Sequence, residues 1–210
     1  MDSGLECAIV SDDLARVAAD VSVCSRCILH KSRVKAVPGE GPAQADIMFV
    51  GEGPGFHENQ QGRPFVGAAG QFLEDLLAGI GLKREDVFIA NVVKCRPPGN
   101  RDPLPEEIEA CRQYLDRQIA LIRPKVIVTL GRFSMARAFP NEKISRIHGQ
   151  PKKVDGIVYV PMFHPAAALH QPSLKKTVEE DFQRLPQILA ELADLQDEEP
   201  PQQAQQLSLF

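Results

Sequence analysis

Short apolar stretches alternate with longer segments of helical periodicity along most of this chain. Stretches rich in Val, Ile and Phe predict four strands, at 46–50, 87–92, 125–130 and 157–161. Apolar residues spaced three and four apart predict helices, at 12–23, 67–80, 105–122, 132–138 and 173–194. Alternating strands and helices indicate a parallel sheet covered on both faces. We therefore expect a single α/β domain, an α/β/α sandwich with a central four-stranded parallel sheet.

Three segments with chemically distinctive residues follow the ends of these predicted strands. They are Gly51–Gly70 after the first strand, Asn91–Cys95 at the end of the second and Phe163–Pro165 after the fourth. Ligand-binding loops of such sheets gather at the carboxyl ends of the strands. We therefore expect the three segments to converge on one site.

The first of these segments is a glycine-rich loop that begins Gly51-Glu52-Gly53-Pro54-Gly55. Glycine lets the backbone approach a ligand closely. A glycine-rich loop after a strand most often binds phosphate or simply turns the chain. The Lys-Ser/Thr ending of a nucleotide P-loop is missing, and no dinucleotide fingerprint follows. This loop alone therefore does not identify a ligand.

Together the three segments resemble those of the uracil-DNA glycosylase superfamily, and within it the family 4 enzymes, over roughly Cys24 to Pro186. The resemblance implies that Glu52 lies in the catalytic loop, that Asn91 recognises the base and that His164 is the catalytic histidine. It also implies the activity of a monofunctional hydrolase on single- and double-stranded DNA. Such an enzyme flips uracil out, hydrolyses its N-glycosidic bond and leaves an abasic site, which initiates base excision repair.

The residue types suit this chemistry. Uracil inside a duplex is unreachable, so the nucleotide must rotate into a pocket that recognises its edge and faces. The amide of Asn91 can bond N3–H and O4 of uracil at once. Phe65 offers an aromatic face, worth about 1–3 kcal/mol per stacked base. We expect Gly53 to line the uracil pocket and His164 to donate to uracil O2 as negative charge develops on the base.

Two carboxylates of the first segment have candidate roles in the hydrolysis. Glu52 is expected to position the water and offset positive charge on the sugar, although better-studied relatives outside family 4 carry aspartate there. Glu58 is a second carboxylate in reach of the water or the charge. The alternative for both is a solvated side chain or a cap on the helix that starts near Gly67.

Four of the five cysteines form a ligand-like set: Cys24, Cys27, Cys95 and Cys111. Four thiolates can hold zinc or an iron–sulfur cluster, and spacing alone does not decide between them. The alternatives are buried apolar cysteines and a Cys24–Cys27 disulfide. The family 4 resemblance implies a [4Fe-4S] cluster with a structural role, because hydrolysis of a glycosidic bond moves no electrons. Cys7 lies outside the matched region and is expected to be a free thiol.

The chain has 210 residues, 43% of them apolar, and a net charge of −4. Residues 186–210 hold five acidic residues and no Lys or Arg, which leaves 23 acidic and 24 basic residues elsewhere. We therefore expect weak phosphate binding from local groups: Lys31/Arg33/Lys35, Arg96/Arg101 and Lys143/Arg146. No apolar run approaches the roughly 20 residues of a membrane span, and the N-terminus lacks the features of a secretion signal. A cytoplasmic, nucleoid-associated monomer is expected.

Two further residues have expected roles near the DNA. In relatives, a bulky apolar residue after the His-Pro pair fills the gap left by the flipped nucleotide. Here Leu169 follows three alanines and is the candidate wedge; its alternative is a core leucine opening a helix. A poor wedge would penalise duplex substrates. His148 lies in a tripeptide similar to the trapping insert of a related branch, but at another place in the chain, so a phosphate or backbone contact is expected.

The C-terminal composition changes sharply after the predicted domain, which we place at 1–195. Residues 196–205 are expected to form a flexible polar tether. The last five resemble the peptide by which bacterial repair proteins dock on the sliding clamp, with Gln206, Leu207, Leu209 and Phe210 as contacts. The alternative is a tail that packs back on its own domain.

Three functions remain in competition: a uracil-releasing hydrolase, a noncatalytic or covalently trapping uracil-DNA binder, and a metal-containing interaction module recruited to the clamp. Intact Phe65, Asn91 and His164 favour the hydrolase. Nothing resembles the lysine nucleophile of a bifunctional lyase, so strand cleavage is expected to need a second enzyme.

Overall fold

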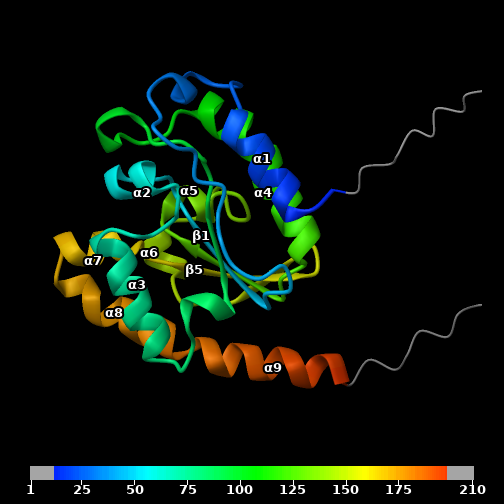
Figure 1. Cartoon of the computed structure of the whole chain (residues 1–210). Helices are drawn as coiled ribbons and strands as arrows, with labels where there is room; N and C mark the ends of the chain where they lie inside the picture. The colour runs from blue at the N-terminus through cyan, green and yellow to red at the C-terminus, as the bar shows by residue number, and fades with distance from the viewer. Residues whose placement is uncertain (1–11, 198–210) are drawn as a thin grey trace, which may run out of the picture.

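Five strands form one sheet in the order β2-β1-β3-β5-β4 in the computed structural model, which describes residues 12–197 (Figure 1). Their bounds are β1 Ile47–Gly51, β2 Phe88–Asn91, β3 Val126–Leu130, β4 Lys152–Val154 and β5 Ile157–Met162. The four longer strands, β1, β2, β3 and β5, are parallel to one another, as expected. The expected total of four strands is wrong, because β4 pairs antiparallel with the outer edge of β5.

The missed strand β4 is short and polar, which explains why apolar patterning did not predict it. It begins Lys152-Lys153 and joins β5 through Asp155 and Gly156, whose φ angles are 50° and 83°. An Asp-Gly pair with both φ angles positive is the preferred two-residue link of a β-hairpin. This dipeptide was therefore the signal for the fifth strand.

The helices lie between the strands and after the last one. Their bounds are α1 Leu14–Val23, α2 Phe56–Gln61, α3 Ala68–Ala78, α4 Pro105–Ile122, α5 Arg132–Met135, α6 Ile144–Ile147, α7 Pro165–His170, α8 Ser173–Gln183 and α9 Leu185–Asp197, with 3₁₀ turns η1 Ile28–Lys31, η2 Arg84–Asp86 and η3 Pro98–Asn100. The helix expected at 173–194 is divided at Arg184. Pro186 has no N–H to continue the ladder, which favours a break there.

The sheet separates two apolar cores. Along β1, Met48 and Val50 belong to the core beneath α1 and α4, while Ile47 and Phe49 belong to the core beneath α3 and α8. Figure 1 shows these helix pairs on opposite sides of the sheet. All five residues of β1 are buried, as expected for a parallel strand covered on both faces. The structure is thus the expected α/β/α sandwich.

The register of the parallel strands brings functional residues to one edge. Gly51 at the end of β1 lies beside Asn91 at the end of β2, and His164 follows β5 directly. Among residues 12–197, no helix has the length and apolar character needed to cross a membrane.

Candidate active site

A cavity of about 340 Å³ lies at the carboxyl edge of the sheet. Its lining residues come from all three segments singled out in the sequence, together with the loop after β2: Glu52, Gly53, Pro54, Gly55, Glu58, Phe65, Ala69, Asn91, Pro97, Asn100, Arg101, His164 and Ala166. Its volume lies within the range of small-molecule sites. The structure therefore brings together the segments that were expected to converge.

Asn91 presents an unpaired polar atom in this cavity. The residue is 2% exposed, and its Oδ1 has no hydrogen-bond partner among the described residues. Buried polar side chains are normally paired, so this one is poised for a donor from a ligand. The space beside it depends on Gly51, where a Cβ would lie 2.5 Å from Asn91 Oδ1 and 2.7 Å from Phe65 Cζ. Any side chain at Gly51 would displace both groups.

Phe65 and His164 form a stacked pair in the cavity, with ring centroids 5.5 Å apart and an interplanar angle of 21°. His164 is the N-cap of α7, and its Nδ1 accepts from the N–H of Ala166 at 3.1 Å. That hydrogen bond leaves the imidazole proton on Nε2. Burial lowers the pKa of His164 to about 4, so the ring is neutral near pH 7. A neutral N–H donor therefore lies in the cavity.

The two glutamates of the loop occupy different environments. Burial raises the pKa of Glu52, and the nearby Asp102 carboxylate raises it further. Glu58 Oε1 accepts from the backbone N–H groups of Val66 and Gly67, at 2.9 and 3.0 Å. Glu58 therefore binds the start of α3, as its alternative role required, while its side chain also lines the cavity. Within the described residues, no N–H or O–H group donates a hydrogen bond to the Glu52 carboxylate.

The loop after β2 supplies cavity residues whose place in the site was not predicted. Pro97, Asn100 and Arg101 line the cavity. Arg101 donates to both oxygens of the fully buried Glu107, at 2.9 and 2.6 Å, and its expected phosphate contact stays a prediction. Arg96 donates to Asn100 Oδ1 at 2.7 Å. Their place in the sequence, between the candidate residue Asn91 and the candidate ligand Cys111, was the signal for these positions.

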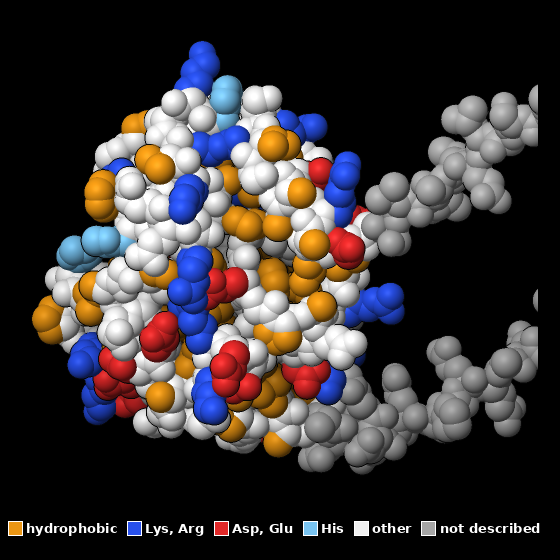
Figure 2. All heavy atoms as spheres, viewed as in Figure 1, with side chains coloured by type: hydrophobic (Ala, Val, Ile, Leu, Met, Phe, Trp, Pro, Cys, Tyr) orange, Lys and Arg blue, Asp and Glu red, His pale blue; other side chains and the backbone are white. Residues whose placement is uncertain are grey.

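Leu169 and His148, the two residues expected near the DNA, lie in different environments. Leu169 on α7 is 46% exposed, so its alternative as a core leucine is wrong. The Nδ1 of His148 lies 2.8 Å from Asp181 Oδ2, and its ring lies 5.0 Å from that of Phe163; its phosphate or backbone contact stays a prediction. On the face shown in Figure 2, Lys and Arg side chains are interspersed with Asp and Glu rather than gathered in one basic patch.

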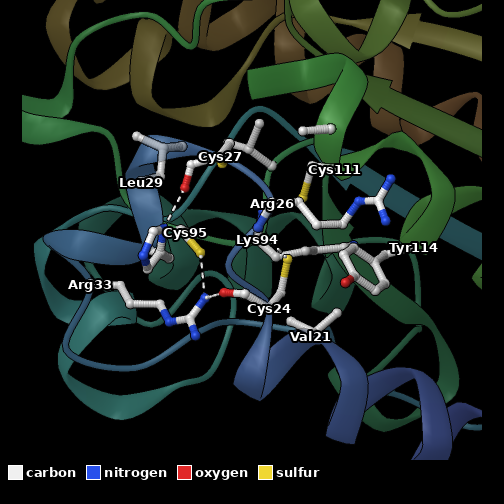
Figure 3. A pocket seen from close by; sticks show the side chains of 13 residues that line it. Val21, Cys24, Arg26, Cys27, Leu29, Arg33, Lys94, Cys95, Cys111 and Tyr114 are labelled. Carbon is white, nitrogen blue, oxygen red and sulfur yellow. Dashed lines mark hydrogen bonds between the residues drawn. The ribbon is translucent and has the colours of Figure 1, made fainter. Parts of the chain in front are cut away.

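The four candidate ligand cysteines line one cavity, which Figure 3 shows between the end of α1, the loop after β2 and α4. No disulfide joins cysteines within residues 12–197, so the Cys24–Cys27 disulfide alternative is wrong. Three N–H groups point at sulfur atoms: Arg26 N to Cys24 and Arg33 Nη1 to Cys95, both at 3.5 Å, and Lys94 N to Cys111 at 3.2 Å. Arg33, which was grouped with Lys31 and Lys35 as a phosphate-binding candidate, therefore contacts the cysteine cavity.

Burial raises the pKa of Cys111 to about 11 and also raises the pKa of Cys27 and Cys95. Metal ligation requires thiolates, so binding a metal here must release protons. The N–H groups that point at sulfur are the kind of contacts that stabilise ligating thiolates. The donor chemistry of these residues therefore suits thiolate ligation, while no three Cys, His, Asp or Glu side chains among the described residues are placed to hold one metal ion.

Lys94 connects the cysteine cavity to Asn91 at the end of β2. It is 1% exposed, and its Nζ donates to Asn91 O at 3.0 Å and to Gln118 Oε1 at 2.7 Å. Burial lowers the pKa of Lys94 to about 8. The same residue donates its backbone N–H to Cys111. One buried residue thus contacts both Asn91 and Cys111.

Comparison with known proteins agrees with this geometry. A family model described as the uracil DNA glycosylase superfamily matches residues 38–189. The chain belongs to that superfamily. It is 49% identical to the type-4 uracil-DNA glycosylase of Sulfurisphaera tokodaii, over 84% of this chain and 85% of the relative. It is 46% identical to that of Archaeoglobus fulgidus, over 84% and 92%, and 48% identical to that of Saccharolobus solfataricus, over 85% and 88%.

Proposed function

We propose that this chain is a monofunctional uracil-DNA glycosylase, which flips uracil out of single- or double-stranded DNA and hydrolyses its N-glycosidic bond. The observation that carries the proposal is the buried Asn91, which lines the same cavity as the stacked Phe65 and His164 and whose Oδ1 has no partner within residues 12–197. The relatives named as type-4 uracil-DNA glycosylases support the same activity. The abasic product would then enter base excision repair.

Recognition of the base rests on complementary hydrogen bonds. Asn91 accepts from uracil N3–H through Oδ1 and donates to O4 through Nδ2, whereas cytosine presents the opposite pattern on this edge. Phe65 supplies a face for stacking, and Gly53 leaves the backbone free to approach the base. Cytosine is rejected because its binding would leave a buried amide group mispaired.

Bond cleavage uses His164 and Glu52. As the glycosidic bond breaks, negative charge develops on uracil, and His164 donates from Nε2 to O2. A single preorganised donor of this kind is worth about 2.7–4 kcal/mol in other enzymes. Glu52 orients the attacking water and offsets positive charge on the sugar, and Glu58 supports the loop through its backbone contacts. The His164 ring needs no protonation, since a neutral imidazole already donates.

Cys24, Cys27, Cys95 and Cys111 would hold a [4Fe-4S] cluster. A single zinc ion needs its sulfur ligands within about 2.3 Å of one point. Among the described residues, no three Cys, His, Asp or Glu side chains are placed to hold one ion. A cluster spreads its thiolates over several irons, which suits four cysteines around one cavity. Its contribution is a structural link between the end of α1, the loop after β2 and α4.

Leu169 is the proposed wedge, since it is exposed and lies on α7, which begins beside His164.

The clamp-binding peptide at Gln206–Phe210 lies outside the described residues, as do Cys7 and most of the proposed tether at 196–205. Helix α9 extends to Asp197, two residues past the expected end of the domain. We propose that this tail docks on the sliding clamp, and that the protein acts as a cytoplasmic, nucleoid-associated monomer.

The test is release of free uracil from a uracil-containing oligonucleotide, followed by alkaline cleavage of the abasic strand. Wild type should release uracil without cutting the strand, and Asn91→Ala and His164→Ala should each lose at least a hundredfold in rate. Asn141→Ala, at an exposed position that does not line the cavity, is the control. A stable protein–DNA adduct with no free uracil would replace this function with a covalent binder.

A further inference from the structure

Phe65 has a backbone conformation that its surroundings must hold in place. Its φ of 51° lies in the left-handed region, where a bulky side chain is an outlier. The residue is 5% exposed, and its ring lines the proposed uracil cavity. Such a conformation costs free energy and persists only where neighbouring contacts compensate. Those contacts therefore decide where the stacking face lies.

Arg84, at the start of η2, makes hydrogen bonds to the Phe65 peptide and the one before it. Its Nη1 donates to Phe65 O at 2.8 Å, and its Nη2 donates to the carbonyl oxygen of Pro64. One guanidinium thus binds two consecutive carbonyls, which its planar fork of donors permits and a lysine ammonium does not reproduce. The Arg84 side chain is only 15% exposed, so water competes little for these bonds.

Glu40 fixes Arg84 in turn. One Glu40 oxygen accepts from Arg84 Nε, and the other accepts from Arg63 Nε at 2.8 Å. The Glu40 backbone pairs with Ile89 of β2 in an isolated antiparallel bridge, with N···O distances of 3.0 and 2.8 Å. A continuous series of contacts therefore runs from the sheet through Glu40 and Arg84 to the Phe65 carbonyl.

Contacts on the other side of the loop complete the restraint. At Gly70 of α3 a Cβ would overlap the carbonyl group of Phe65, so the helix backbone packs directly against that peptide. Glu58 binds the N–H groups of Val66 and Gly67, the two residues that follow Phe65. The carbonyl side of Phe65 is thus held by Arg84, and the peptide groups after it are held by Glu58.

We propose that Arg84, oriented by Glu40, is a positioning residue for uracil recognition, because it holds the Phe65 ring where the base stacks. Arg84 does not line the cavity, so it acts through Phe65 rather than on the base. The inference rests on the proposed function, since it takes uracil as the occupant of the cavity.

The test compares Arg84→Lys with wild type in the presence and absence of the Phe65 ring. Lysine keeps the charge beside Glu40 but loses the bidentate contact. We expect about a tenfold rise in KM for a uracil-containing oligonucleotide and about tenfold weaker inhibition by free uracil, with kcat little changed, as expected for one lost charged hydrogen bond. In a Phe65→Ala background the same change should have no further effect, because the positioned ring is absent.

Arg137→Lys is the matched control. The Arg137 side chain is 26% exposed, and its Nη1 lies 2.5 Å from Asp116 Oδ1. Arg137 does not line the uracil cavity. Its variant should bind free uracil as wild type does. Unchanged uracil inhibition in Arg84→Lys, or an equal loss with and without the Phe65 ring, would overturn the proposal.

Hydrogen exchange separates failure of this inference from failure of the proposed function. If wild type neither releases nor binds uracil, the proposed function fails. Exchange of the backbone amide hydrogens of Arg63, Phe65, Val66 and Gly67 still tests the restraint itself. Faster exchange in Arg84→Lys than in Arg137→Lys supports it, and equal exchange in the two variants rejects it.

Discussion

Replacing Asn91 by leucine should make the protein more stable and abolish uracil excision. The Asn91 side chain is buried, and its Oδ1 has no partner among the described residues. An unsatisfied buried acceptor costs about 1–3 kcal/mol of stability. Leucine has a similar branched shape without polar atoms, so Asn91→Leu should recover a cost of that size. Each kcal/mol corresponds to a rise in Tm of roughly 2–4 °C for a domain of this size.

The same substitution removes both of the hydrogen bonds that we propose between Asn91 and the edge of the base. Sites that bind a polar substrate group commonly lose roughly 10⁴-fold in kcat/KM when that pairing is lost. Free uracil at about 100 times its Kd should stabilise wild type by about 2.7 kcal/mol and leave Asn91→Leu unchanged. Stability and function should therefore move in opposite directions, a trade-off common at active sites.

The assay is a thermal melt of both proteins at one scan rate, with and without uracil, beside a single-turnover excision measurement. Asn59→Leu is the matched control, because Asn59 is also buried but its Oδ1 accepts from Val34 N at 2.9 Å. That variant should melt lower, since it leaves the Val34 N–H unpaired. An Asn91→Leu protein that melts no higher than wild type would refute the idea that the unpaired oxygen is a stored cost.

Further outcomes follow from the cavity, the cysteines and the tail. The rate of uracil excision should rise with pH as Glu52 ionises, because its ionised form is needed. Burial raises the pKa of Glu52 above its ordinary 4.5, so this rise should lie above pH 4.5. His164, with a pKa of about 4, stays neutral in that range. Glu52→Gln should remove this rise from the pH–rate profile. A rise that persists in Glu52→Gln and is lost only in His164→Gln would assign the ionisation to His164 instead. Cys111→Ser should lose visible cluster absorbance and lower the Tm, and an unchanged spectrum would remove Cys111 from the ligand set. Leu169→Ala should slow excision from duplex more than from single strands, measured as the ratio of the two rates; an unchanged ratio would contradict the wedge. Deleting residues 206–210 should abolish clamp pull-down and leave excision from free oligonucleotides intact, whereas lost excision would refute that division of roles.

The strands were predictable where burial made them continuously apolar. The predicted 125–130 and observed β3 at Val126–Leu130 differ by one residue, and 157–161 and β5 at Ile157–Met162 likewise. A short edge strand carries no such signal, so β4 was missed, although Asp155-Gly156 marked its hairpin. The break between α8 and α9 was also missed, since apolar spacing continues across it and only Pro186 marks it.

The candidate site also has features that the sequence predicted and features that it did not. Convergence of Asn91 and His164 followed from alternation of strands and helices, because parallel strands present their carboxyl ends at one edge. The ion pair of Arg101 with Glu107 and the hydrogen bond from Arg84 to the Phe65 carbonyl could not be predicted from the sequence. Both depend on which charged side chain meets which partner across two loops, and loop composition does not specify that.

The sequence by itself determined the alternation of strands and helices, the set of chemical groups and the edge of the sheet where they meet. These properties follow from local periodicity and from the geometry of parallel sheets, which hold whatever the loops do. Only the tertiary structure decided that Asn91 Oδ1 has no partner in the described part of the chain, that the His164 proton lies on Nε2, and which contacts hold Phe65 in its unfavourable conformation. Each depends on atoms brought together from segments far apart in the chain, and their distances exist only once the domain has packed.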